Sequence, residues 1–175
     1  MFPSGTYILA TEPLTEAEVA QINPLDLAVC DQNQVLDYFR LSADRRLLFG
    51  GGCNYSGREP RSIEKVMAPR LRRIYPQLGH KRIDYAWGGK VGVVVNRTPL
   101  LGRIGENIFY AQCYSGHGVS LNHACCEVMA DAVAGTFGRM DIFSQAPHRR
   151  IPFGPAVGGY AVALGMLYLR LLDLR

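Results

Sequence analysis

Apolar and polar residues alternate along several short stretches of the chain and follow a helical period in others. Alternation or a short apolar run bounded by turn residues predicts strands at residues 5–11, 35–41, 46–50, 82–87, 90–95 and 107–112. Helical spacing of apolar residues predicts helices after Thr15, over residues 63–74 and from about His117 to Ala134. The mixture of antiparallel strand pairs and intervening helices predicts an α+β fold.

The strands are expected to pair as two hairpins. The first hairpin joins residues 35–41 to 46–50 around residues 42–45, and the run Gly50-Gly51-Gly52 is expected to end its second strand. The second hairpin joins residues 82–87 to 90–95 and is expected to turn at Gly88-Gly89.

Helix boundaries are marked by capping residues and prolines. Thr15 and Glu18 have the spacing of a capping box, and Leu14 and Val19 that of a hydrophobic staple. In the next helix, Pro60 is expected at the first helical position. Pro69 lies inside the helical run and is expected to kink or divide it.

The most informative stretch follows the predicted strand at residues 107–112. There Ser115, Gly116 and Gly118 form a small, polar turn that leads into the helix ending before Gly135, and Ser115 is expected to cap that helix. A helix start with bare amides and no side-chain obstruction attracts negative charge. The alternative is a tight connection that binds nothing. In the helix we expect one buried stripe, formed by Val119, Cys126, Ala130 and Val133.

Two further groups of residues leave alternatives open. Tyr38 and Arg40 share one strand face, where the guanidinium could receive a carboxylate bidentately or simply lie on an exposed face. Trp87, the only tryptophan, could wall a pocket beside Gly88 or fill a core.

Composition narrows the class of protein. With 175 residues, 48% hydrophobic and 19% charged, the chain is expected to be globular. The net charge of +4 and scattered basic clusters argue against nucleic-acid binding. Five cysteines without CxxC spacing argue against zinc and a disulfide framework and favour a reducing cytoplasm. No signal peptide is visible, and the uncharged run at residues 156–169 is shorter than a bilayer span, which favours a docked helix or a subunit contact.

Several motifs occur in the order found in one family. Residues 7–14, 35–51, 85–89, 96–102 and 114–119 resemble the C-terminal half of a flavin-dependent amine or amino-acid oxidase of the D-amino-acid-oxidase-like superfamily, nearest the gamma-glutamylputrescine oxidase branch. The resemblance runs along nearly the whole chain.

The resemblance implies a cofactor, a substrate class and a set of site residues. The cofactor is FAD, and the substrate is a small amine or amino acid that loses hydride from a C–N carbon to flavin N5 before imine hydrolysis and reoxidation by dioxygen. Cofactor binding is implied for Trp87, Gly88, Gly102, Ser115, Gly116, His117, Gly118 and Val119. Substrate binding is implied for Tyr38, Arg40 and Tyr114. No catalytic residue and no metal ligand is implied.

The chain departs from the family pattern in two ways. Cys113 stands where the family usually has glycine, and no G-x-G-x-x-G dinucleotide fingerprint occurs in the 175 residues. The implied layout is a substrate domain at 1–97, the C-terminal part of an otherwise missing Rossmann-like FAD domain at 98–140, and an apolar tail at 141–175. One interpretation is a truncated or split oxidase that alone binds FAD weakly or not at all, with a separate chain carrying the FAD-binding half. The other is a non-catalytic remnant that serves as an interaction module or subunit.

Overall fold

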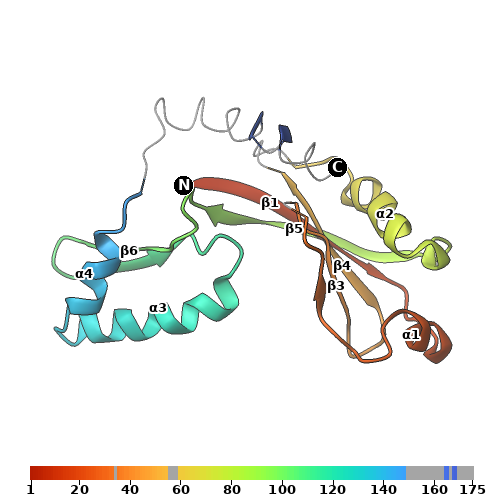
Figure 1. Ribbon diagram of the computed structural model, residues 1–175, viewed down its shortest axis with the longest axis horizontal. Helices are drawn as coiled ribbons and strands as arrows, with labels where there is room; N and C mark the ends of the chain where they lie inside the picture. Colours follow the sequence, from red (N-terminus) through yellow and green to blue (C-terminus); the bar gives the residue numbers. More distant parts are fainter. Residues whose placement is uncertain (34, 55–58, 149–163, 166, 169–175) are drawn as a thin grey trace. The chain divides into compact units, whose positions relative to one another are not determined.

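The computed structural model describes residues 1–33, 35–54, 59–148, 164, 165, 167 and 168, and divides the chain into two compact units (Figure 1). We call Gly5–Lys90 with Tyr160–Arg175 the sheet unit, and Met1–Ser4 with Val91–Gly159 the turn unit. Antiparallel strands and helices occur together, which confirms the expected α+β class. The expectation for the tail at 156–169 falls almost wholly outside the described residues.

The main sheet has five strands in the order β2-β3-β4-β1-β5. Their bounds are β1 Phe2–Thr11, β2 Val29–Cys30, β3 Tyr38–Leu41, β4 Leu47–Asn54 and β5 Ile83–Val93. The pairs β2/β3, β3/β4 and β4/β1 are antiparallel, so the first predicted hairpin is confirmed.

The three consecutive glycines do not end β4, contrary to expectation, because each accommodates a neighbouring side chain. In the β3/β4 register Tyr38 lies opposite Gly50, and its ring occupies the space where a Cβ of Gly50 would be. Gly51 makes room in the same way for the carboxylate of Asp37. Gly52, at a φ of 63°, lies at a register shift against β1, and a Cβ there would stand 2.7 Å from the sulfur of Met67. The glycines therefore permit close packing within a continuous strand.

The second predicted hairpin is wrong, since Gly88 and Gly89 lie inside the single long strand β5. A Cβ on Gly88 would stand 2.8 Å from Cδ1 of Tyr7 and 3.3 Å from Cδ1 of Ile63. Gly88 thus lets β5 pass close to a buried aromatic ring, which a sequence pattern does not distinguish from a turn.

The helices of the sheet unit are α1 Glu16–Ile22, α2 Ile63–Ile74 and the 3-10 turn η1 Pro76–Leu78. The predicted capping box at Thr15 and Glu18 is present. The N-cap of α2 is Ser62, so Pro60 is not its first residue, and Pro69 does not divide the helix. Met67 and Leu71 of α2 pack with Phe49 and Leu9 in the core of the unit.

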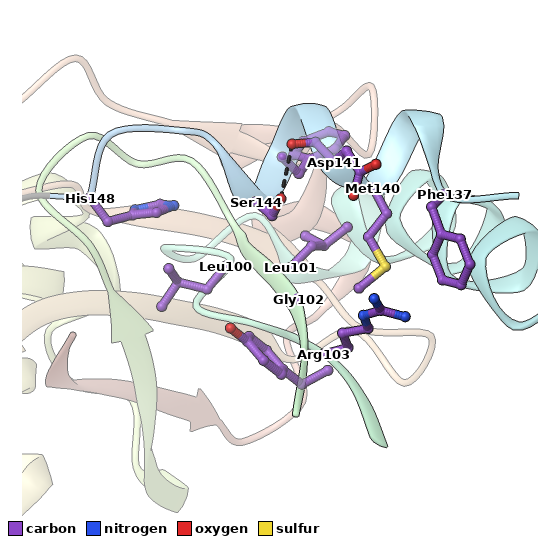
Figure 2. A pocket seen from close by; sticks show the side chains of 11 residues that line it. Leu100, Leu101, Gly102, Arg103, Phe137, Met140, Asp141, Ser144 and His148 are labelled. Carbon is purple, nitrogen blue, oxygen red and sulfur yellow. Dashed lines mark hydrogen bonds between the residues drawn. The ribbon is translucent and has the colours of Figure 1, made fainter. Parts of the chain in front are cut away.

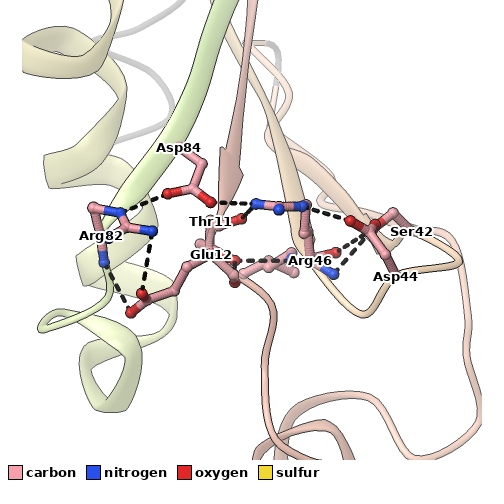
Figure 3. A network of polar contacts seen from close by, with 8 residues as sticks. Thr11, Glu12, Ser42, Asp44, Arg46, Arg82 and Asp84 are labelled. Carbon is pink, nitrogen blue, oxygen red and sulfur yellow. Dashed lines mark hydrogen bonds and ion pairs between the residues drawn. The ribbon is translucent and has the colours of Figure 1, made fainter.

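A polar network joins the ends of three strands on the sheet (Figure 3). Arg46 donates to Asp84 and to Asp44, each at 2.6 Å, and to the carbonyl oxygen of Thr11 at 2.9 Å. Arg82 bonds the other oxygen of Asp84 at 2.7 Å. The hydrogen bonds from Arg82 and Arg46 lower the pKa of the Asp84 carboxyl below its usual range, which keeps the carboxylate ionised and the strand ends tied at neutral pH.

The turn unit is built on a two-stranded antiparallel sheet covered by two helices. Its elements are β6 Leu100–Ile104, β7 Ile108–Gln112, α3 Gly118–Val133 and α4 Gly138–Ser144. The predicted strand at 107–112 and the helix ending before Gly135 are confirmed, and Gly135 has the left-handed φ of 92° expected after a helix end.

The expected buried stripe of α3 is wrong. The helix buries Cys125, Val128 and Ala132 against Leu101 and Met140. The side chains of Val119 and Val133 are instead 90% and 69% exposed. Apolar residues occur on both sides of α3, so the helical period alone could not decide which side the unit covers. No helix among the described residues combines the length and apolar character that a membrane span requires.

Candidate functional site

The turn between β7 and α3 has an unusual backbone. Cys113 and Ser115 adopt left-handed φ values of 64° and 53°, and Gly116 follows at 94°. Residues with a Cβ disfavour this region by roughly 1–2 kcal/mol each, so such conformations persist only where their surroundings enforce them. Strain of this kind concentrates at binding and catalytic sites.

Ser115 is buried and does not cap α3, contrary to expectation. The N-cap of α3 is His117, which makes no side-chain capping bond. The Ser115 hydroxyl instead accepts from the amide of Val94 at 3.3 Å, and the Ser115 amide donates to the carbonyl of Gly92 at 3.0 Å. Ser115 lies two residues before the N-cap, where its hydroxyl meets the chain after β5.

The second half of the turn is open. Gly116 and His117 are exposed, and no atom lies within 4 Å of the position that a Cβ of Gly116 would occupy. The first intrahelical bond runs from the amide of Leu121 to the carbonyl of His117 at 3.0 Å, so the amides at residues 118–120 precede the helical ladder. This arrangement suits a negatively charged group, because a bare helix start offers donors and positive potential.

Cys113, which stands where the resemblance implies a glycine, has a buried thiol. A Cβ on Gly92 would stand 3.1 Å from Sγ of Cys113, so the thiol packs closely against the glycine backbone. Burial raises the pKa of the Cys113 thiol, which favours the protonated, unreactive form. Cys113 is therefore a packing residue in this turn.

Tyr114 points its hydroxyl to α3. Its hydroxyl donates to Oδ1 of Asn122 at 3.0 Å, and its ring packs against the core of the turn unit. Burial raises the pKa of the Tyr114 phenol. The side chain is half-buried at the edge of the open turn.

Gly102 lies in the wall of a cavity of about 260 Å³ in the turn unit (Figure 2). In the β6/β7 register it faces Tyr110, whose ring covers the space of the missing side chain. The cavity also involves Arg103, whose guanidinium lies 4.9 Å from the ring centroid of Phe137, and His148, whose shielded nitrogens have no hydrogen-bond partner among the described residues. No sequence motif predicted this cavity.

The remaining predicted residues lie in the sheet unit. On β3, Tyr38 shares a 3.1 Å hydrogen bond with Oγ1 of Thr6, and Arg40 is exposed with no acidic partner among the described residues. On β5, Trp87 is 44% exposed beside Gly88. Strands β4 and β1 separate β3 from β5, so these two pairs are not neighbours in the sheet.

The structure thus distributes the eleven predicted residues over both units. It brings the contiguous set from Tyr114 to Val119 together at one turn, in the unit that also contains Gly102. Sequence reasoning missed Gly92 and Val94, which hold that turn. An isolated glycine inside a strand pattern signals close backbone approach, so Gly92 carried a usable but unspecific signal.

Comparison with known proteins identifies the family of the chain. A family model described as FAD dependent oxidoreductase (DAO) matches residues 1–132. Gamma-glutamylputrescine oxidoreductase of Escherichia coli is 39% identical over 171 residues, which are 98% of this chain and 40% of the relative. A probable oxidoreductase, OrdL, of Haemophilus influenzae is 35% identical over 173 residues, covering 99% of this chain and 39% of the relative. The chain therefore spans about 40% of the length of these curated relatives.

Solved structures show the same fold at low sequence identity. Glycine oxidase from Geobacillus kaustophilus superposes with a TM-score of 0.65 at 18% identity, over 85% of this chain and 39% of that one. L-proline dehydrogenase from P. horikoshii superposes with a TM-score of 0.59 at 18% identity, over 81% of this chain and 38% of that one. The chain belongs to the DAO family of FAD-dependent oxidoreductases.

Proposed function

We propose that this chain provides the substrate sheet and the flavin-facing turn of an FAD-dependent oxidase of the gamma-glutamylputrescine oxidase type. The substrate would be a small amine or amino acid. The dinucleotide-binding half would come from residues or a chain outside these 175, which contain no G-x-G-x-x-G motif. In this layout residues 1–97 serve the substrate, 98–140 belong to the FAD domain and 141–175 form an apolar tail.

The observation that supports this proposal is the turn before α3. In a chain of a flavin-dependent family, a strained backbone holds a glycine with open space beside it directly before an uncapped helix start. The amides of Gly116, Gly118 and Val119 would stabilise the negative charge that accumulates near flavin N1 and O2, whereas the His117 amide already donates to the carbonyl of Tyr114 at 3.0 Å. Bound FAD would accept the hydride, and so two electrons, that the substrate loses from its C–N carbon.

The substrate residues would act by binding. Nε of Arg40 donates to the carbonyl oxygen of Leu41 at 3.1 Å, so a carboxylate would be bound by the two Nη groups of this exposed side chain. Tyr38, on the same strand face, is held by Thr6. Tyr114, in the turn unit, would also bind the substrate.

The first test is the colour of the protein. We expect the purified chain to be colourless and to bind added FAD weakly or not at all. Co-expression with the segment of the E. coli relative that lies outside the match should restore flavin absorption and amine-dependent peroxide formation. Absorption spectra with and without added FAD measure flavin binding by the chain and by the assembly, and a peroxide assay with added amine measures turnover. Tight stoichiometric FAD in the chain alone would overturn the predicted deficit, and a colourless co-expressed assembly would overturn the cofactor assignment.

A charge variant makes this test specific to the turn. Gly118→Asp places a carboxylate at the start of α3, where it favours the helix but repels the flavin, so it should abolish the recovered colour without loss of thermal stability. Gly138→Asp is the matched control at the start of α4, where no side chain crowds the position. Equal loss of colour in both variants would contradict the role of the turn.

A second candidate function is an interaction module without catalysis. It is favoured by the exposed apolar face of α3, on which Val119 and Val133 lie one above the other along the helix. We expect the purified chain to associate through this face. The double substitution Val119→Asp with Val133→Asp should lower the molar mass of the particles in light scattering and leave the thermal midpoint of unfolding unchanged. His123→Asp, on an exposed position of the same helix, is the control. Association together with restored colour supports the split oxidase, whereas association without colour supports the module.

A further inference from the structure

Ser115 makes contacts that set it apart from the other residues of the turn. It is 5% exposed, and both its backbone and its side chain bond to the segment at the end of β5. Its amide donates to Gly92 at 3.0 Å, its hydroxyl accepts from the amide of Val94 at 3.3 Å, and the same hydroxyl lies 3.4 Å from the carbonyl oxygen of Cys113. The hydroxyl thus accepts one hydrogen bond and donates another within the chain, and its burial turns the side chain away from a ligand.

The contacts of Ser115 coincide with the strained part of the backbone. Residues 113 and 115 both have left-handed φ values although neither is glycine. Without compensating contacts the turn would relax, because each such residue costs roughly 1 kcal/mol or more. The bonds to Gly92 and Val94, and the packing of Cys113 against Gly92, supply that compensation.

We propose that Ser115 is a positioning residue for the cofactor and does not contact it through its side chain. Its hydroxyl accepts from the amide of Val94, which fixes the turn and so sets the direction in which the open amides of Gly116, Gly118 and Val119 point. This inference rests on the proposed function, and it assigns Ser115 and Gly92 a role that the family match does not define.

The clean test is Ser115→Gly, because glycine adopts a φ of 53° without strain and the change removes the hydroxyl. Ser120→Ala is the matched control, since it removes a serine hydroxyl that donates to the carbonyl of His117 at 3.3 Å on the exposed side of the same helix. Amide exchange of Val94 by NMR reports the fastening itself. In the assembly co-expressed with the missing half and freed of its flavin, the shifts of the Gly116 and Gly118 amides on titration with FAD report how tightly the cofactor binds at the turn.

We expect Ser115→Gly to speed exchange of the Val94 amide about tenfold. The apparent affinity for FAD, measured from the shifts, should also fall about tenfold. Ser120→Ala should change neither quantity. Unchanged Val94 exchange in Ser115→Gly would overturn the fastening. Faster exchange with unchanged FAD titration would show a structural bond only, and would overturn the positioning role. If FAD shifts none of these amides in the assembly that contains the unmodified chain, the cofactor site itself is wrong, and the positioning role fails with it.

Discussion

Replacing Arg70 by methionine is expected to lower the free energy of unfolding by about 3–5 kcal/mol at neutral pH, because the buried carboxylate of Asp37 then has no ion-pair partner at hydrogen-bond distance. Asp37 has no exposed side-chain surface; its Oδ1 accepts from Nε of Arg70 at 2.8 Å and lies 2.7 Å from Nη2 of the same guanidinium. The nearest other cation is Arg73, whose Nη2 lies 3.5 Å from Oδ2, too long for a good hydrogen bond. Urea denaturation of the two proteins measures the loss.

The loss should depend on pH in a defined direction. Burial raises the pKa of the Asp37 carboxyl above its ordinary value even with Arg70 present, and removing the guanidinium raises that pKa further. A raised folded-state pKa favours folding when the group is protonated. The destabilisation in Arg70→Met should therefore be full near pH 7 and shrink as the pH falls toward about 4. Arg72→Met, at an exposed position of α2, is the control and should change stability by about 0.5 kcal/mol or less. A pH-independent loss would contradict the stranded charge.

Gly51→Ala is expected to cost about 2–4 kcal/mol, through backbone strain and displacement of the same carboxylate. Gly51 has a φ of 150°, which residues with a Cβ rarely adopt. A Cβ there would meet Oδ1 of Asp37 and stand 2.8 Å from the backbone carbonyl oxygen of Leu36. Backbone cannot move aside as a flexible side chain can, so the clash must distort β4 or eject Asp37.

The matched control for Gly51 is another glycine in a strand. Gly89 lies in β5, where a Cβ would have no atom within 4 Å and the φ is not left-handed, so Gly89→Ala should stay within about 0.5 kcal/mol of the parent. Thermal and urea unfolding of both variants test the pair. Similar losses at the two positions would show that glycine flexibility, and not the space for Asp37, sets the stability of the sheet.

Local signals predicted much of this fold. The capping box at Thr15, the hairpin of β3 and β4, and the helix that ends before Gly135 each depend on neighbours a few residues apart, which a sequence displays directly. The errors concern distant partners. Gly88 has the sequence context of a turn residue, but it lies inside a strand because the ring of Tyr7, from the first strand of the chain, packs against it. Likewise, the side of α3 that is buried depends on where β6 lies.

The candidate site divides in the same way. The motif around Gly116 and the helix start were visible as a glycine-flanked turn, and the structure shows that turn open. The hydroxyl of Ser115 was assigned to the nearest amides along the chain, whereas it bonds to Val94, 21 residues away. Capping rules describe local competition for a hydroxyl and contain no information on a strand that folds back beside it.

Both units contain a tyrosine laid over a glycine on the opposing strand, Tyr38 over Gly50 and Tyr110 over Gly102. Each ring takes the volume that a side chain on its partner would need, so the two positions of a pair cannot diversify independently. A homologue with alanine at position 50 or 102 would need a smaller residue in place of the tyrosine on the opposing strand. In this family tree, joint replacement at both positions of a pair would be the mark of such an exchange.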